Sequence, residues 1–287
     1  MLRVGTRGSA LALRQTDIAV EHLVRVRAGL AVDIVEISTK GDRDKITPFE
    51  QLGPKGIFAH ELQRALVDGD IDVAVHSLKD LTGAEPEGLV IASVPERTDP
   101  RDVLVSRDGC LFAELDAGST VGTSSVRREA LVHAARPDLK TVPLRGNVDM
   151  RLRKVADGEV DAAILAAAGV LRLQRDDEIV QWLDPLEFVP PPGQGAIAIE
   201  ARADRLASDL AWLVASEDPQ VRACVDAERE LMRLVEGSCD VPLGAWARYE
   251  QDTIVMDAFL VRDGFARGRA TGTDPIVVAS DLAAALL

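Results

Sequence analysis

Short apolar runs alternate with helix-period segments over the first two thirds of the chain. Strands are expected at nine of these runs: Leu2–Gly5, Val32–Ser38, Ile71–Val75, Leu89–Val94, Asp102–Ser106, Thr120–Gly122, Thr141–Leu144, Ala162–Ala166 and Ala196–Glu200. This alternation is typical of an α/β fold, in which helices cover a largely parallel sheet.

Helices are predicted between these runs. Phe58, Leu62, Ala65 and Leu66 share one helical face, and Gly69 is well placed to end that helix. Two further helices, each opened by a serine that can cap it, are expected at Ser9 to about Val26 and at Ser125 to about Ala135.

Two proline-rich stretches, Pro95–Pro100 and Pro190–Gly193, interrupt the alternation. They predict a pair of crossovers, by which the chain leaves a first lobe and later returns to it. At about 150 residues per domain, 287 residues predict two domains or three small ones. We expect a discontinuous first lobe of residues 1–95 and 196–215, a second lobe of residues 99–191, and a C-terminal domain of residues 217–287.

The pattern changes after about Ser216. A helix from Pro219 to about Val235 carries a broad apolar face, and two strands are expected at Ala245–Tyr249 and Thr253–Val261. The chain ends on a helix-like segment at Asp281–Leu287. This mixture predicts a small α+β domain.

Hydroxyls, small residues and cations follow five of the predicted strands. In open parallel sheets ligands bind beyond the carboxyl ends of the strands, where helix N-termini also present free N–H groups. Arginine forks match carboxylates, so this arrangement predicts a cleft that holds a small ligand with several negative groups. The segments are Thr6-Arg7-Gly8-Ser9, Thr39-Lys40-Gly41-Asp42, His76-Ser77-Leu78-Lys79-Asp80, Thr123 to Arg128, and Arg145-Gly146-Asn147 with Arg151 about one turn later.

Charge and composition exclude several classes of protein. The 33 basic and 47 acidic residues give a formal charge of −14, which disfavours general binding to nucleic acid or anionic membranes. The longest apolar run is too short to span a membrane, and no secretory signal is visible, so we expect a cytoplasmic protein. The 3 cysteines and 4 histidines show no metal-binding spacing, and no phosphate-binding glycine motif occurs.

Two residues do not fit simple anion binding. Asp80 would repel an anionic ligand unless it meets a cation or an N–H group, and its plainer interpretation is an ion pair with Lys79 or a nearby arginine. Cys239 lies in a predicted loop, where it could be a nucleophile, an attachment point or an incidental surface thiol. Cys224, on an apolar helix face, is expected to serve packing.

These same residues carry a family resemblance. From about Val4 to Gly244 the chain resembles hydroxymethylbilane synthases, also called porphobilinogen deaminases. Nine segments in order are far more specific than a single motif. They are GTRGSALAL, STKGD, GPKGIFAHELQRAL, DVAVHSLKD, RTDPRDVLVS, GTSSVRR, LRGNVDMRL, PPGQGAIAIE and EGSCDVPLG.

The resemblance implies fold, reaction and cofactor. The fold would be two periplasmic-binding-protein-like lobes with mixed, largely parallel sheets and two crossovers, plus a small C-terminal α+β domain. The enzyme would be a monomeric transferase that joins four porphobilinogen molecules head to tail and releases ammonia and hydroxymethylbilane. Its dipyrromethane cofactor would be held by Cys239 through a thioether bond, and Asp80 would be the catalytic carboxylate. The product would pass to uroporphyrinogen-III synthase.

The resemblance also implies binding roles. Lys79, Asp80, Ser125, Arg127, Arg128 and Arg151 would bind the cofactor, and Arg7, Ser9 and Arg145 the incoming ring. Arg172 would contact the growing chain, Lys55 and Asp42 would lie in a loop over the cleft, and Gln194 would lie in the return crossover. The chain departs from its relatives at Gln51, where many have a lysine, and at Thr82-Gly83, where proline is common.

Two alternatives remain open on the residues alone. Two lobes with two crossovers also describe solute-binding proteins and the effector domains of regulators, which are non-catalytic binding modules. A cysteine-nucleophile enzyme with Cys239 and His76 as its pair would instead show rapid thiol alkylation, whereas a thioether-blocked Cys239 would not react.

Overall fold

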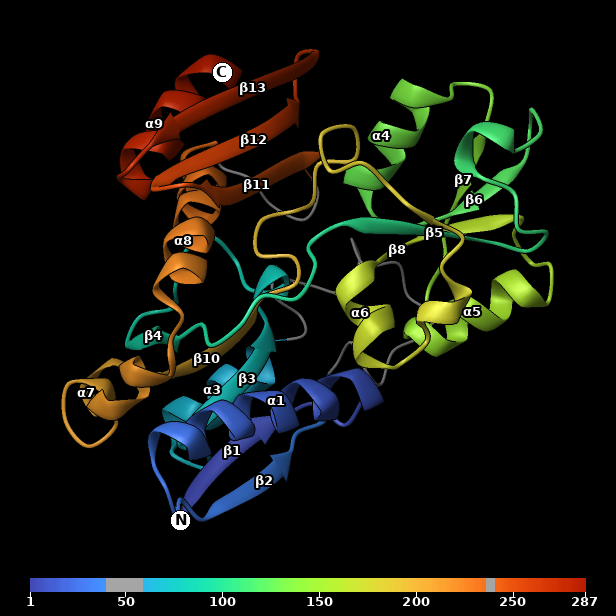
Figure 1. The fold of residues 1–287 in the computed structure, drawn as a ribbon. Coiled ribbons are helices and arrows are strands. Elements are labelled where there is room, and N and C mark those ends of the chain that lie inside the picture. The colour runs from blue at the N-terminus through green and yellow to red at the C-terminus, as the bar shows by residue number, and fades with distance from the viewer. Residues whose placement is uncertain (40–58, 236–240) are drawn as a thin grey trace.

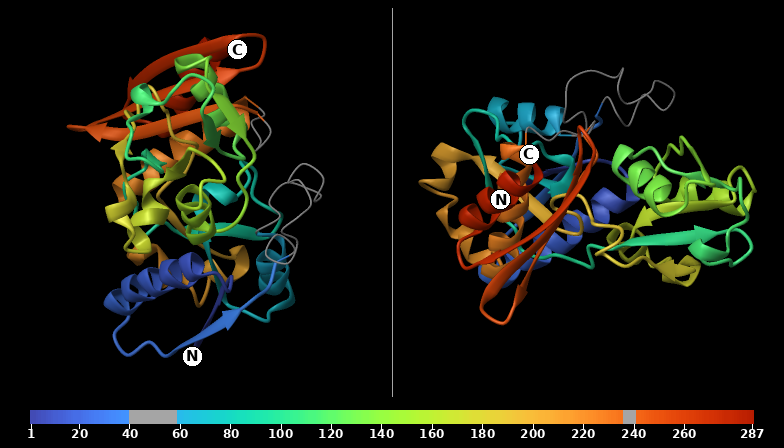
Figure 2. Two further views of the ribbon diagram at one scale, coloured as in Figure 1. Left: turned by 90° about the vertical axis from the view of Figure 1, so that its right-hand side faces the viewer. Right: turned by 90° about the horizontal axis from the view of Figure 1, so that it is seen from above.

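The computed structural model describes residues 1–39, 59–235 and 241–287. Within these ranges the strands form two five-stranded sheets and one three-stranded sheet. The sheets lie in three separate bodies, with the N-terminus on the first and the C-terminus on the third (Figures 1 and 2). No helix in the described ranges is both long enough and apolar enough to cross a membrane.

The first sheet belongs to the first lobe. Its order is β2-β1-β3-β10-β4, and β10 is antiparallel to its two neighbours. Helix α1 (Ala10–Val26) packs on one face, and α3 (His60–Asp68) packs on the other. The strands are β1 (Leu2–Thr6), β2 (Val32–Glu36), β3 (Val73–Ser77), β4 (Leu89–Ser93) and β10 (Ile197–Arg202).

The second lobe repeats this plan. Its sheet has the order β7-β6-β8-β5-β9, and β5 is the antiparallel strand. One face is covered by α4 (Val126–Ala135), and the other by α5 (Val148–Ala156) and α6 (Ala167–Arg172). The strands are β5 (Asp102–Ser106), β6 (Thr120–Gly122), β7 (Lys140–Val142), β8 (Ala162–Ala166) and β9 (Gln181–Trp182).

Each antiparallel strand is delivered by a crossover. The first crossover leads from β4 into β5, and the second returns from β9 to β10. The two segments run side by side, since the Thr98 N–H donates to the Gly195 carbonyl at 3.0 Å and the backbones of Arg97 and Ala196 form an isolated antiparallel β-bridge. Gly195 has φ +87, and a Cβ there would lie 2.2 Å from the Thr98 carbonyl oxygen, so only glycine fits this approach. The predicted two-lobe fold with two crossovers is confirmed.

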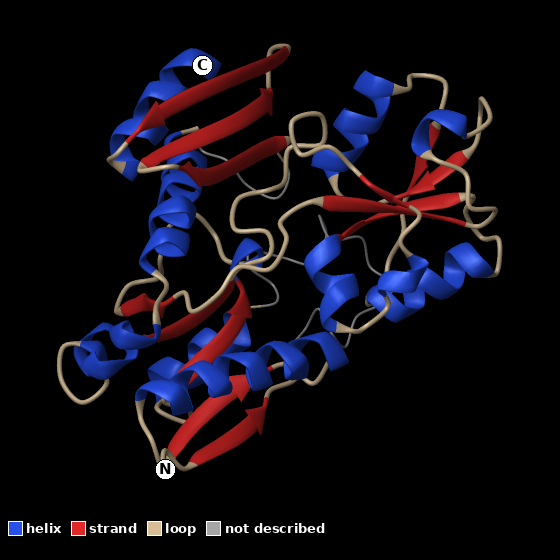
Figure 3. Ribbon diagram, in the orientation of Figure 1, coloured by secondary structure: helices blue, strands red, loops and turns tan. Residues whose placement is uncertain are grey.

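The third body contains the C-terminal sheet and two helices (Figure 3). Strands β11 (Leu243–Glu250), β12 (Thr253–Val261) and β13 (Phe265–Gly272) form an antiparallel sheet. Helices α8 (Pro219–Leu234) and α9 (Pro275–Leu286) cover one face and share its apolar core. The small α+β domain predicted for this region is therefore confirmed as a fold, while the three unit boundaries stay predictions.

A buried glutamate connects this body to both crossovers. Glu228 of α8 is 0% exposed and accepts from Arg97 Nη1 at 2.7 Å and Nη2 at 3.2 Å. The backbone N–H groups of Gly193 and Ala247 donate to the same carboxylate, each at 2.7 Å. Because burying an unpaired charge is costly, these four bonds offset the cost of placing the carboxylate in the interior.

Two C-terminal elements differ from the predictions. Helix α9 begins at Pro275, with Asp274 as its cap, so the segment at Asp281–Leu287 is only its second half. Strand β13 was not predicted, because its inward positions carry only Ala and Gly. A Cβ on Gly268 would lie 2.7 Å from Leu282 of α9, so the close packing of α9 requires small residues on this face of β13. Small residues give little of the alternating hydrophobic pattern from which a strand is predicted.

Strand ends also shift within the two lobes. The run predicted at Ile71–Val75 forms β3 at Val73–Ser77, because β10 pairs with His76 and Ser77 and extends the ladder. The run predicted at Thr141–Leu144 forms β7 at Lys140–Val142, opposite a β6 of only three residues. Strand β9, with two residues, was not predicted.

Candidate active site

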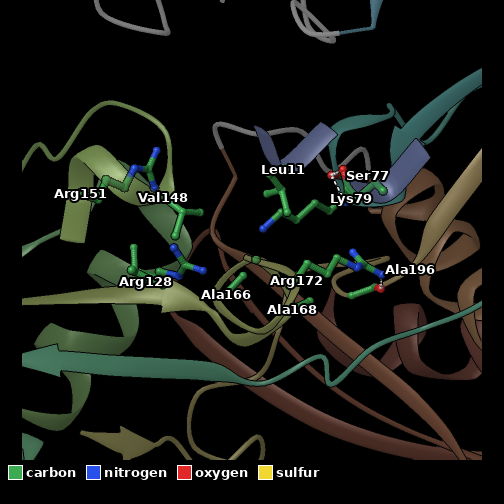
Figure 4. Close-up of a pocket in the computed structure, with 14 residues that line it drawn as sticks. Leu11, Ser77, Lys79, Arg128, Val148, Arg151, Ala166, Ala168, Arg172 and Ala196 are labelled. Carbon is green, nitrogen blue, oxygen red and sulfur yellow. Dashed lines mark hydrogen bonds between the residues drawn. The ribbon is translucent and has the colours of Figure 1, made fainter. Parts of the chain in front are cut away.

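A pocket lies between the two lobes, and four cations contribute to its wall. Lys79 comes from the first lobe, and Arg128, Arg151 and Arg172 come from the second. Figure 4 shows Arg128 and Arg151 on one side of the pocket and Lys79 and Arg172 on the other. The remaining lining residues are small, apolar or neutral: Leu11, Gln15, Ser77, Val148, Leu165, Ala166, Ala168, Gly169, Gly195 and Ala196.

Local structure explains why these cations meet. Lys79 lies in the 3₁₀ turn Leu78–Asp80 that directly follows β3. Arg128 lies in the first turn of α4, and Arg151 in the first turns of α5, each helix following a strand of the second sheet. Ser125 caps α4 and accepts from the Arg128 N–H. The carboxyl ends of the strands therefore bring these cations together, as the sequence predicted.

Lys79 is tied to the return crossover. Its Nζ donates to Gln194 Oε1 at 3.1 Å, and Gln194 is 0% exposed. Burial, followed by repulsion from Arg128, lowers the pKa of Lys79 to about 8, although Asp80 and Asp102 oppose that shift. The pocket therefore holds an ammonium that titrates close to neutral pH.

The Asp102 carboxylate forms ion pairs with Arg127 and Arg128, two of the arginines predicted to bind the cofactor. Asp102 Oδ2 accepts from Arg127 Nη2 at 2.6 Å, and Oδ1 accepts from Arg128 Nη2 at 2.8 Å. Burial alone would raise the pKa of Asp102, but the two arginines hold it well below its usual range. The other terminal nitrogen of Arg127, Nη1, donates to the Val189 carbonyl at 2.8 Å, and Arg127 does not line the pocket.

Arg151 and Arg172 are desolvated cations in the pocket wall. Burial lowers the pKa of Arg151 to about 10, and repulsion from Arg128 and Arg145 adds to the shift. Burial also lowers the pKa of Arg172, opposed by the Glu96 carboxylate that accepts from its Nη2 at 3.1 Å. Arg172 Nε has no hydrogen-bond partner within the described ranges. An anionic ligand would relieve the cost of burying these charges.

Asp80 lies beside this cluster and is less engaged than Asp102. In the described part of the chain its one ion pair is a long one, 3.9 Å from Oδ2 to Arg7 Nη1, and its side chain is 31% exposed. Asp80 also raises the pKa values of Lys79 and Arg151, which places its charge next to both cations. Its oxygens can therefore still accept from a ligand N–H group.

The other predicted site residues fall into two groups. Ser9 caps α1 and accepts from the Ala12 N–H at 3.3 Å, and Arg145 is partly buried near Arg151. Cys239, Lys55 and Asp42 lie outside the described residues. The two other cysteines are described, and burial raises the pKa of the Cys224 thiol to about 12, which makes it inert.

Sequence reasoning missed Asp102 and Gln15. Asp102 opens an apolar strand, and a carboxylate at the start of a buried strand is a signal that cations must converge on it. Gln15 lies on the inner face of α1 and donates from Nε2 to Ser77 Oγ at 2.8 Å. A buried glutamine on a helix face is a similar signal.

Comparisons with known proteins cover nearly the whole chain. Residues 2–209 match the family model "Porphobilinogen deaminase, dipyromethane cofactor binding domain", and residues 222–287 match "Porphobilinogen deaminase, C-terminal domain". The porphobilinogen deaminase of Brevibacillus brevis is 44% identical over 290 residues, covering 99% of this chain and 93% of the relative. That of Acidothermus cellulolyticus is 46% identical over 267 residues, covering 91% of this chain and 79% of the relative.

A solved structure, that of a nutrient-binding protein from Burkholderia cenocepacia bound to methionine, is similar over 77% of this chain and 93% of its own. It is 17% identical with a TM-score of 0.45, too distant to bear on function. The two family models and the curated relatives all carry the name porphobilinogen deaminase, and together they match nearly the whole chain. The chain therefore belongs to the porphobilinogen deaminase family.

Proposed function

We propose that the chain is a hydroxymethylbilane synthase, which condenses four porphobilinogen molecules on a covalent dipyrromethane group and releases hydroxymethylbilane and ammonia. The observation that carries the proposal is the pocket between the lobes, to whose wall Lys79, Arg128, Arg151 and Arg172 contribute, with the Asp80 carboxylate close to Lys79 and Arg151. Pyrroles with acetate and propionate arms present carboxylates to the cations and ring N–H groups to Asp80.

The donor set fits a dipyrromethane group. Such a group carries several carboxylates, and Arg172 Nε is buried with no partner in the described ranges. We assign Lys79, Arg128 and Arg151 to its carboxylates, with Ser125 at the α4 N-terminus beside them. When bound, the group supplies the pyrrole carbon to which the first substrate ring is joined.

Asp80 is assigned the catalytic role. Each condensation breaks the aminomethyl C–N bond of porphobilinogen, releases ammonia and forms a C–C bond. Loss of ammonia leaves a substrate ring whose nitrogen is positively charged, and an Asp80 carboxylate aimed at that nitrogen stabilises the charge where it develops. Asp80 can also accept the proton that the attacked ring carbon loses.

The incoming ring is assigned to the first-lobe side and to the segment between β7 and α5. Arg7 lies within ion-pair distance of Asp80, so a carboxylate bound by Arg7 brings its ring to the catalytic oxygen. Ser9 and Arg145 are assigned to the same ring, Arg172 to the growing chain, and Lys55 to the loop over the cleft. Gln194, which is 0% exposed, is assigned to holding Lys79 in the pocket wall and not to direct contact with the substrate. Arg127 supports the site through Asp102.

The intact mass of the denatured protein tests the proposal. The full chain is incubated with excess porphobilinogen and sampled at short times. We expect excess mass equal to two pyrrole units, followed by a ladder of single-ring steps. A non-catalytic binding module would bind reversibly, so an unchanged mass after prolonged incubation contradicts the proposal.

Cys239→Ala is expected to give a folded protein with no stable covalent pyrrole mass, because the thiol anchors the chain and makes each coupling effectively intramolecular. Cys110→Ala and Cys224→Ala serve as controls and should load normally. Intact mass and a thermal melt are the measurements. Stable loading of Cys239→Ala would move the attachment to another residue.

Loading of the apoprotein is expected to slow as the pH rises through about 8. Lys79, whose pKa burial lowers to about 8, is a cation below that pH and neutral above it, so the ligand carboxylates lose a partner at high pH. Lys79→Arg stays charged and should lose this decline, whereas Lys140→Arg, at an exposed position on β7, should keep it. The initial rate of mass gain at each pH is the measurement. An unaltered decline in Lys79→Arg would assign it to another group.

We further propose that the protein works as a monomer in the cytoplasm and that its product is passed to uroporphyrinogen-III synthase. A reducing compartment keeps Cys239 as a free thiol, which can then form the thioether bond.

A further inference from the structure

Asp102 is a buried carboxylate at the junction of the two lobes. It is the first residue of β5, the strand that the first crossover delivers to the second lobe, and it is 0% exposed. Apolar residues usually occupy such positions, and a carboxylate is tolerated there only with charged partners.

Three side chains converge on this carboxylate. Besides its bond from Arg127 Nη2, it accepts from Arg128 Nη2 at 2.8 Å and Nε at 3.2 Å. Gln194 Nε2 donates to Asp102 Oδ1 at 2.8 Å. Arg128 is therefore held by a two-point contact, which fixes the plane of its guanidinium where it faces the pocket.

Gln194 extends this network to the first lobe. Its amide oxygen accepts from Lys79 Nζ at 3.1 Å, while its amide nitrogen binds Asp102. Its backbone carbonyl accepts from Arg97 Nε at 3.0 Å, so the crossover backbone holds the glutamine in place. Lys79, Gln194, Asp102 and Arg128 thus form a continuous hydrogen-bonded chain, and both ends of that chain line the pocket.

We propose that Asp102 is a positioning residue that holds Arg128 directly, and Lys79 through Gln194, at a fixed separation so that both cations bind one anionic ligand. This inference rests on the proposed function for the identity of the ligand. The charge of Asp102 also offsets the mutual repulsion of these cations, and it raises the pKa of Lys79 against the effect of burial.

The test compares two buried carboxylates that are each held by two arginines. Asp72 accepts from Arg3 Nη2 at 2.9 Å and from Arg205 Nη1 at 3.2 Å, and it is not part of the pocket wall. Asp102→Asn and Asp72→Asn each remove one such charge. If Asp102 were only structural, both variants would lose stability and neither would change the pocket.

The first measurement is the pKa of Lys79 in the apoprotein, from competitive labelling of its amine with acetic anhydride across a pH series. In Asp102→Asn we expect that pKa to fall by about one unit, which raises the labelling rate at neutral pH roughly fivefold. In Asp72→Asn we expect no change. The second measurement is the rate of loading by porphobilinogen, expected to fall about tenfold or more in Asp102→Asn alone.

Unchanged labelling and loading in a folded Asp102→Asn variant would overturn the proposal. If that variant does not fold, Gln194→Met replaces it, because it breaks the link to Lys79 and leaves both arginines on Asp102. Normal labelling and loading in Gln194→Met would overturn the proposal equally. The labelling needs no substrate, so failure of wild-type protein to load would contradict the proposed function and leave the Asp102 comparison valid.

Discussion

Asp80→Asn is expected to lower kcat by at least about 10²-fold while leaving the fold and the attachment of the cofactor largely intact. The variant keeps the shape of the side chain but removes the negative charge that faces the substrate nitrogen, and it cannot accept a proton. Within the described residues the one ion pair of Asp80 is the long one to Arg7. Removing the charge of Asp80 therefore breaks no close ion pair, and we expect the fold to tolerate it. Single-turnover rates on loaded protein, together with a thermal melt, are the measurements.

Asp80→Ala should behave similarly, and Glu87→Gln is the matched control. Glu87 is an exposed acid seven positions further along the same segment, and its removal changes the net charge by the same amount. Near-normal turnover in both Asp80 variants would remove this carboxylate from the catalytic role.

Glu228→Ala is expected to lower the free energy of unfolding by about 3–5 kcal/mol, because it leaves the buried Arg97 guanidinium without its partner. The Gly193 and Ala247 N–H groups would also lose their acceptor. Urea titration followed by circular dichroism measures the loss.

Glu230→Ala is the control for this loss. Glu230 lies on the same helix and pairs with Arg233, whose side chain is 56% exposed, so its removal should cost about 1 kcal/mol or less. Equal losses in the two variants would show that the buried network adds nothing beyond a surface ion pair.

Three of the four pocket cations could be predicted from the sequence because each follows a strand, whereas Arg172 was indicated only by the family resemblance. Lys79 comes directly after β3, and Arg128 and Arg151 lie on helices that follow β6 and β7. Parallel strands end at one edge of a sheet, so position along the chain was enough to bring these residues into one region.

The network around Asp102 could not be predicted in this way. Its partners Arg127, Arg128 and Gln194 lie 25, 26 and 92 positions away. The two arginines reach it from α4 of the same lobe, and only the meeting of the crossovers brings Gln194 to it. The same limit applies to β13, whose inward Ala and Gly residues carry meaning only once α9 is seen to pack against them.

The placement of β10 has a consequence for synthesis of the protein on the ribosome. Among the strands that the structure describes, β4 pairs only with β10, and β10 ends at Arg202. The strands of the second sheet, by contrast, are all contained between Asp102 and Trp182. The nested lobe can therefore complete its sheet on the nascent chain while the N-terminal lobe, although made first, still waits for the antiparallel strand that joins β3 to β4. The N-terminal lobe is thus translated first but completed later, and until then the edges of β3 and β4 are open to mispairing.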